Sequence, residues 1–191
     1  MNQNNQVWRK IFDNIEFNDQ YNVSQGTVEK VFVDNKTSSW RIVLSLPEVL
    51  TLEIMEDLTN KVKEYCLKEF KIKTVKFNIS YLNFEEYSKR NCFSNELNKY
   101  FKKAIEICST VTKSVLVINE YDYEIENKTI IIHVPTEAEV KIINTVLPLV
   151  KKYLETYGFG SVEFNVHETG EIYNIMDRRI AQQRVNEQMN D

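Results

Sequence analysis

Large apolar side chains follow two different periods along this chain, and the order of the periods occurs twice. In residues 40–46 the apolar side chains alternate with polar ones, as in a β-strand that has one buried face. Pro47 ends this strand, because proline has no N–H to donate to a neighbouring strand. Residues 129–134, followed by Pro135, form a second apolar strand ended by proline. The sequence therefore predicts two similar units.

After each proline the apolar positions change to helical spacing, which gives each helix one apolar stripe. The predicted stripe of the first helix consists of Ile54, Leu58, Val62, Tyr65 and Cys66. The predicted stripe of the second helix consists of Ile143, Val146, Leu147, Val150, Tyr153, Leu154 and Tyr157. Strands at residues 75–81 and 162–166 close the two units.

The ends of the second helix carry their own markers. Thr136 and Glu139 have the T-x-x-E spacing of a capping box, in which two side chains bond the free N–H groups of a helix start. Gly158 predicts the helix end, because glycine readily adopts the left-handed conformation common there. Gly160 is expected to ease the turn into the last strand.

A helix and a β-hairpin precede each proline. Helical spacing occurs at residues 7–15 and 93–108, and hairpins are predicted from residues 27–46 and 121–134. Residues 114–118 fit either a buried strand or a short helical turn, since short apolar runs cannot be typed by periodicity. The predicted fold class is α+β: two small KH-like units, each built of helix, β-hairpin, helix and strand, with helices packed on a three-stranded sheet.

The duplication divides the 191 residues into domains. We expect a first N-terminal domain at residues 1–82 and a second at residues 83–170. Residues 171–191 are charged and rich in Gln, which predicts a helical tail or linker. The chain is therefore expected to be the front part of a longer protein.

The charge and the cysteines limit the classes of function. The net charge of -4 argues against strong non-specific binding of nucleic acid, which depends on Lys and Arg. A local group of lysines is either a solvated face or a nucleic-acid contact: Lys61, Lys68, Lys71, Lys73 and Lys76. The 3 cysteines form no C-x-x-C pair, which favours free thiols in a reducing cytoplasm. No apolar run reaches the roughly 20 residues that span a bilayer, so we expect a soluble protein.

Candidate chemistry is sparse. Asp122 and Glu124 have the D-x-E spacing of two-metal nuclease sites, but the preferred interpretation is a charged outer strand face that discourages edge pairing. His133 and His167 lie in predicted strands without a second ligand at metal-binding spacing. The G-x-x-G loop with which KH domains grip RNA is missing. The sequence therefore predicts no catalytic residue, no cofactor and no metal.

Several segments together resemble the N-terminal region of PolC-type DNA polymerase III alpha subunits, from Gram-positive bacteria and mycoplasmas. They are residues 38–47, the Thr136-Glu137-Ala138-Glu139 helix start, the Tyr157-Gly158-Phe159 helix end and the Arg- and Gln-rich tail. The resemblance implies a first domain similar to the polymerase-binding domain of the clamp-loader tau subunit. It implies a second domain that is KH-like and similar to the N-terminal domain of DnaA, with a helical turn at residues 114–118.

The same resemblance implies the function. The PolC-type parent is a DNA-directed DNA polymerase with a 3'-5' exonuclease, but its catalytic carboxylates lie beyond the point that corresponds to Asp191. We therefore expect a non-catalytic, monomeric, cytoplasmic module that binds replisome proteins such as the clamp-loader tau subunit. The alternative is a module that binds single-stranded DNA or a primer-template through the lysines named above.

Overall fold

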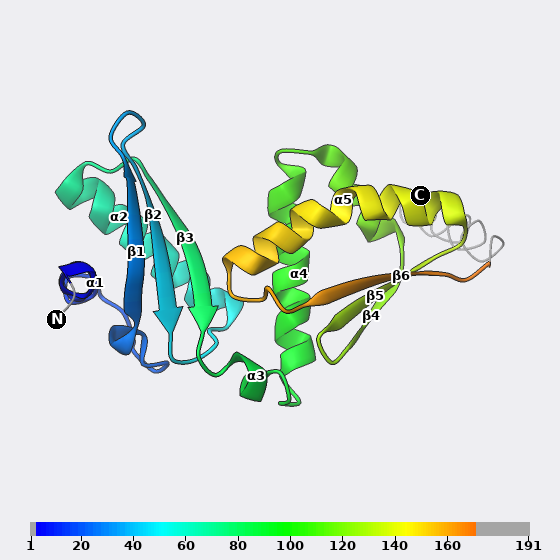
Figure 1. Cartoon of the computed structure of the whole chain (residues 1–191), viewed down its shortest axis with the longest axis horizontal. Helices are drawn as coiled ribbons and strands as arrows, with labels where there is room; N and C mark the ends of the chain where they lie inside the picture. The colour runs from blue at the N-terminus through cyan, green and yellow to red at the C-terminus, as the bar shows by residue number, and fades with distance from the viewer. Residues whose placement is uncertain (1–2, 171–191) are drawn as a thin grey trace, which may run out of the picture.

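Two separate three-stranded sheets form the framework of the protein (Figure 1). The computed structural model describes residues 3–170, with strand orders β1-β2-β3 and β4-β5-β6. Helices pack on these small sheets, so the predicted α+β class is confirmed. The predicted tail at residues 171–191 lies outside the described residues.

The first sheet has the predicted order of helix, hairpin, helix and strand. Its elements are α1 (Gln3–Phe12), η1 (Val23–Gln25), β1 (Thr27–Asp34), β2 (Ser39–Leu46), α2 (Leu52–Phe70) and β3 (Thr74–Tyr81). Strand β2 pairs antiparallel with β1 and parallel with β3. Val75, Phe77 and Ile79 alternate with exposed residues on β3 and are buried, as predicted.

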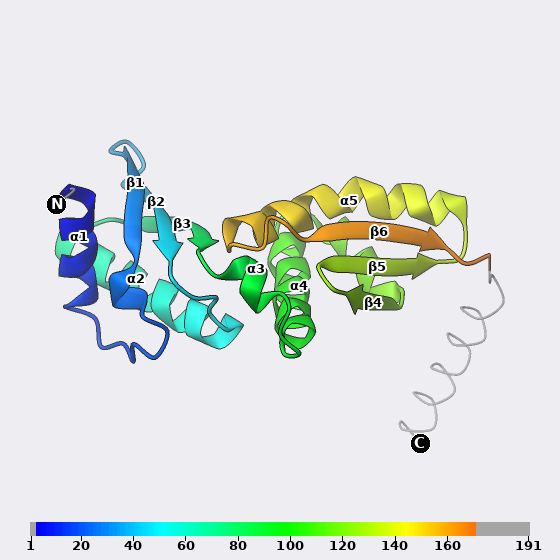
Figure 2. The same cartoon turned by 60° about the horizontal axis from the view of Figure 1, so that its bottom comes forward.

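Helix α2 covers one face of this sheet, and α1 lies beside the edge strand β1 (Figures 1 and 2). The buried stripe of α2 includes Met55 in place of the predicted Ile54, which is half-buried, as is Tyr65. Met55 is buried because it faces the second half of the molecule. No helix among residues 3–170 covers the other face of this sheet.

The second sheet repeats the arrangement with two additions. Its elements are α3 (Phe84–Tyr87), α4 (Phe93–Ser109), η2 (Lys113–Glu120), β4 (Tyr123–Glu126), β5 (Thr129–Val134), α5 (Glu137–Thr156) and β6 (Glu163–Glu168). The open question at residues 114–118 is answered by the 3-10 helix η2. The Thr136–Glu139 capping box is present, with the Thr136 N–H donating to Glu139 Oε2 over 3.0 Å. The short helix α3 was not predicted.

A continuous hydrophobic core joins the two sheets. Phe159, from the loop after α5, is only 1% exposed. Its ring centroid lies 4.4 Å from that of Tyr100, 5.5 Å from Phe84 and 6.3 Å from Tyr81. These partners come from α4, α3 and β3, so one side chain of the second half is packed among residues of both halves.

Buried polar groups reinforce this joint. The Tyr100 hydroxyl donates to the Leu50 carbonyl over 3.1 Å, and the Leu52 N–H donates to Glu96 Oε1 over 2.6 Å. Glu96 is 6% exposed, and its carboxylate caps a free N–H at the start of α2 from the neighbouring helix α4. Losing either partner would leave a buried polar group without a bond.

The joint requires glycine at position 158. Gly158 has φ +86°, and a Cβ there would lie 2.4 Å from Cε2 of Tyr81. Beside it, Tyr157 forms an isolated parallel bridge with Ile79 at the free edge of β3. Any side chain would therefore both strain the backbone and push the Tyr81 ring out of the joint.

None of the helices in residues 3–170 is both long and apolar enough to cross a bilayer.

Replacing Gly158 tests the joint. We expect Gly158→Ala to lower the free energy of unfolding by about 2–4 kcal/mol, from backbone strain and overpacking against Tyr81. Gly160→Ala is the matched control, because its Cβ would meet only ordinary contacts at 3.4 Å or more. That control should change stability by less than about 0.5 kcal/mol in urea denaturation. Equal losses in the two variants would contradict the packing described at Gly158.

The three cysteines provide a second test of packing. Burial raises the pKa of the Cys66 thiol to about 11 and also raises that of the half-buried Cys108, whereas Cys92 is exposed. Because the thiolate is the reactive form, a disulfide reagent at pH 8 should modify Cys92 first and Cys66 last. In denaturant all three should react at similar rates. Rapid native labelling of Cys66 would show that α2 does not cover it.

Candidate binding surfaces

The uncovered face of the first sheet presents a row of one aromatic and two cationic side chains. Phe32 on β1 lies opposite Arg41 on β2, and Arg41 lies beside Lys76 on β3. Because neighbouring strands are about 4.8 Å apart, the row places a ring and two cations side by side. The register places these outward side chains on the open face: Thr27, Lys30, Phe32, Asp34, Ser39, Arg41, Val43, Ser45, Thr74, Lys76, Asn78 and Ser80.

Phe32 is held between cations and remains accessible. The Lys30 ammonium lies 4.5 Å from the ring centroid, and the Arg41 guanidinium carbon lies 4.4 Å from it. The side chain is 38% exposed. An exposed cation–π contact contributes only ~0.5–1 kcal/mol, so a flat ligand that stacks on the ring can displace the flexible Lys30.

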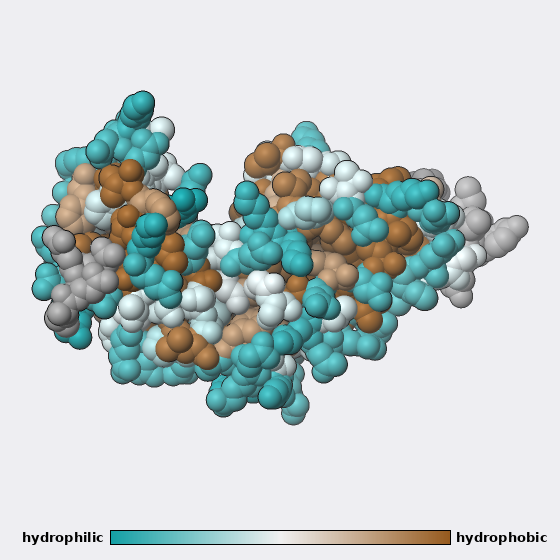
Figure 3. All heavy atoms as spheres, in the orientation of Figure 1, coloured by the Kyte–Doolittle hydropathy of each residue, from teal (hydrophilic) through white to brown (hydrophobic). Residues whose placement is uncertain are grey.

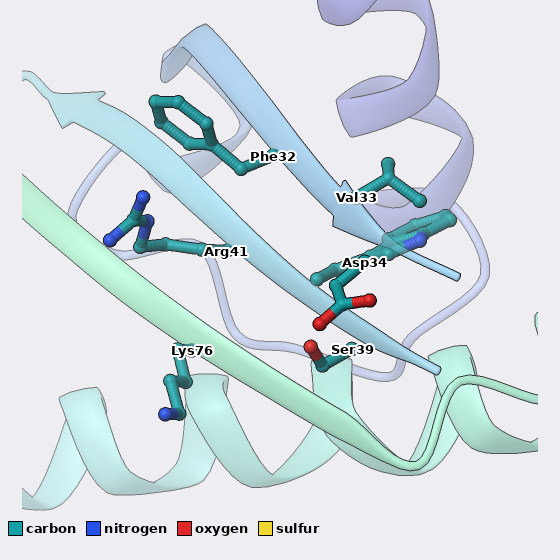
Figure 4. A pocket seen from close by; sticks show the side chains of 7 residues that line it. Phe32, Val33, Asp34, Ser39, Arg41 and Lys76 are labelled. Atoms are coloured by element: carbon teal, nitrogen blue, oxygen red, sulfur yellow. The ribbon is translucent and has the colours of Figure 1, made fainter. Parts of the chain in front are cut away.

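A shallow groove of about 220 Å³ runs along this row (Figure 4). It is lined by Phe32, Val33, Asp34, Ser39, Trp40, Arg41 and Lys76. Figure 4 shows Phe32, Arg41 and Lys76 reaching out from three adjacent strands. The anion at its end, Asp34, accepts hydrogen bonds from the Thr37 hydroxyl and the Lys36 N–H, which hold its pKa below the usual value. Asp34 is therefore engaged by its own turn.

The lysines singled out from the sequence do not share one surface. Lys61 and Lys68 line a hollow of about 300 Å³ formed by α2 and the segment after α1. Lys71 ends α2 in the left-handed conformation, and its ammonium donates to the Lys68 carbonyl over 2.9 Å. Lys73 precedes β3, and only Lys76 belongs to the open face. Whether any of the five contacts nucleic acid stays a prediction.

Phe32, Lys30 and Arg41 were missed by sequence reasoning. The predicted turn at Asp34 could have revealed this pair, because a hairpin that turns there places Phe32 opposite Arg41. The β-bulge at Glu29 shifts the register of β1 and still leaves Lys30 and Phe32 on the same face.

The candidate chemistry of the second sheet is a row of polar side chains. His133 Nε2 lies 3.0 Å from Glu124 Oε1, and the His133 and His167 ring centroids are 5.7 Å apart. Within residues 3–170 no three His, Cys, Asp or Glu side chains are grouped so that they could hold a metal ion. Glu124 is therefore a hydrogen-bond partner of His133 in this row, and the D-x-E spacing at Asp122 gains no support as a nuclease site.

Comparison with protein families decides what the first half is. Residues 9–79 match the family described as DNA polymerase III polC-type N-terminus I. This segment belongs to the PolC N-terminal domain I family. The predicted PolC resemblance is thereby confirmed for residues 9–79, a range that contains every side chain of the open face except Ser80. No curated protein and no solved structure matches the chain.

A second candidate surface lies outside the PolC-matched range. Large exposed apolar side chains of the second half are Ile107, Val111, Leu116, Ile142 and Leu149. Helices α4 and α5 lie side by side, with Cys108 Sγ donating to the Leu149 carbonyl over 3.6 Å. Val111 is 86% exposed, more than any other large apolar side chain in the described part of the chain. Figure 3 shows hydrophobic side chains over this half. We call these five residues the α4–α5 patch.

A groove of about 390 Å³ separates α2 from α4 and α5. Two of its charged side chains pair with each other, because Lys103 lies 3.0 Å from Glu56, and Lys103 also lies 3.3 Å from Glu106. Tyr153 and Tyr157, whose ring centroids are 4.8 Å apart, line the same groove. Burial raises the pKa of both tyrosines. Both tyrosines therefore remain neutral at physiological pH, and their rings line the contact between the halves.

The open face predicts an unequal response of two phenylalanines in PolC domain I. Phe77 lies on the covered face and is 3% exposed. Phe77→Ala should lower the free energy of unfolding by about 3–5 kcal/mol. Phe32→Ala should cost only about 1 kcal/mol, because it removes surface cation–π contacts and little core packing. Thermal or urea denaturation of the two variants measures the difference. Similar losses would mean that the Phe32 face is covered.

Proposed function

We propose that this chain is a non-catalytic docking module of a PolC-type replicative polymerase, and that it binds another protein of the replication machinery. The PolC match supports a polymerase N-terminal module, and the α4–α5 patch supports protein binding. Grouped apolar side chains on the surface of a folded protein mark interaction sites more often than chance. The exposure of Val111 is the single observation that carries the proposal.

The patch favours a helical partner segment. Ile142 and Leu149 are seven residues apart on α5, so they lie on one side of this helix, and Leu149 lies next to α4. Two adjacent helices offer a shallow apolar channel, into which an amphipathic helix lays its apolar face. The exposed Lys113 and Lys152 lie close to Val111 and Leu149 in the sequence. We therefore expect acidic side chains beside the apolar face of the partner.

Titration calorimetry tests this function. The whole chain is titrated with the clamp-loader tau subunit, single-strand binding protein and helicase-loading proteins of the same replication system. At least one partner should release or absorb heat, and Val111→Glu should weaken that binding by about tenfold or more, since it buries a charge in an apolar contact. Leu67→Glu is the control, because Leu67 is also exposed, at 53%, but lies on α2.

Two results would overturn the proposal. One is the lack of heat with every protein tested. The other is a partner whose affinity falls equally in Val111→Glu and Leu67→Glu, which would place the contact elsewhere. Circular dichroism of both variants confirms that each remains folded before the titrations are compared.

A further inference from the structure

We propose that the open face of the first sheet binds single-stranded DNA, with one base stacked on Phe32 and the flanking phosphates bound by Arg41 and Lys76. This site is separate from the α4–α5 patch and uses a different class of ligand. The proposal rests on the cross-strand row that the register of β1, β2 and β3 creates.

The ring and the cations are placed as a nucleotide needs them. An unstacked base has a flat face that stacks on an aromatic side chain, whatever the base identity. Arg41 lies over the Phe32 ring and beside Lys76, so a phosphate next to the stacked base falls within reach of both cations. Lys30, once displaced from the ring, is free to meet a neighbouring phosphate.

The rest of the face fits nucleic acid better than protein. Around the row the outward side chains are short and polar, namely Ser45, Asn78 and Ser80. A protein-docking surface needs an apolar centre, whereas the apolar side chains on this face are Phe32, whose ring contacts two cations, and the half-buried Val43. Hydroxyl and amide groups beside Lys and Arg are the usual partners of phosphate and sugar. The segment belongs to a DNA polymerase family, which favours DNA over RNA.

The charge balance sets the expected strength. Lys30, Arg41 and Lys76 lie on the open face together with the anion Asp34, and Glu29 lies at the β-bulge of β1. Asp34 is held in the hairpin turn by Thr37, at the far end of the groove. With three cations and two nearby anions, binding should be modest and sensitive to salt.

Fluorescence anisotropy with a labelled oligo-dT of about 16 nucleotides tests the site, since that length spans a typical single-strand site. In a plot of log affinity against log salt concentration, the slope should be about -2 for three neutralised phosphates.

Four variants locate the contact in the same assay. Phe32→Ala should weaken binding about tenfold, and Phe32→Tyr should preserve it. Arg41→Gln should make the slope shallower by about 0.7. The double variant Lys61→Gln, Lys68→Gln, on the α2 side, should behave as the parent protein.

Each opposite result overturns the proposal. Absence of binding at low salt does so directly. Unchanged affinity in Phe32→Ala would show that no base stacks on this ring. Loss of oligo-dT binding in the Lys61 and Lys68 variant would place the contact on α2. A duplex that binds as tightly as oligo-dT would rule out a stacked unpaired base, and an oligo-U that does so would rule out a site for DNA rather than RNA. Loss of a protein partner, rather than of oligo-dT, in Phe32→Ala would make the face a protein contact. None of these outcomes depends on Val111, so the docking function is judged independently.

Discussion

The burial of Phe159 among Tyr81, Phe84 and Tyr100 is the interaction on which the rest of the structure depends. Each sheet with its helices is small enough that it would bury only about 60–65% of its unfolded surface alone. A fully buried phenylalanine contributes about 1.5–3 kcal/mol, and each favourable ring pair adds ~0.5–1.5 kcal/mol. These terms are a large part of the stability of a small domain. The two halves therefore form one folded body through this cluster, although their sheets are not joined.

This joint also decides which surfaces remain available for binding. It occupies the first turns of α2, the body of α4 and the end of α5, where Glu96 and Tyr100 bond the backbone of the other half. The outer face of the first sheet lies away from the joint, and the α4–α5 patch uses exposed side chains of helices whose buried side chains form the joint. The protein and DNA contacts proposed above would thus lie on different surfaces and would not compete for one site.

Local patterns predicted most of the secondary structure, because alternation, helical spacing and capping depend on neighbours in sequence. Thr136 and Glu139 form their capping box as predicted, and the apolar alternation of β3 places Phe77 inside. Packing across distant segments was not predictable in this way. The residues next to Phe159 in the sequence give no indication that its ring packs against Tyr81. Likewise, closeness in sequence did not bring Lys61 and Lys76 together, because a helix and a strand turn them to different sides.

The position of Phe159 late in the chain has a consequence for synthesis on the ribosome. The ribosome makes the first sheet and α3 long before the aromatic side chain that covers Tyr81 and Phe84. At about 5–20 residues per second, the interval between Tyr81 and Phe159 lasts roughly 4–15 s. During that interval the Tyr81 and Phe84 rings of the nascent chain lack the Phe159 ring that covers them. The native packing around these rings is completed only when the second half emerges.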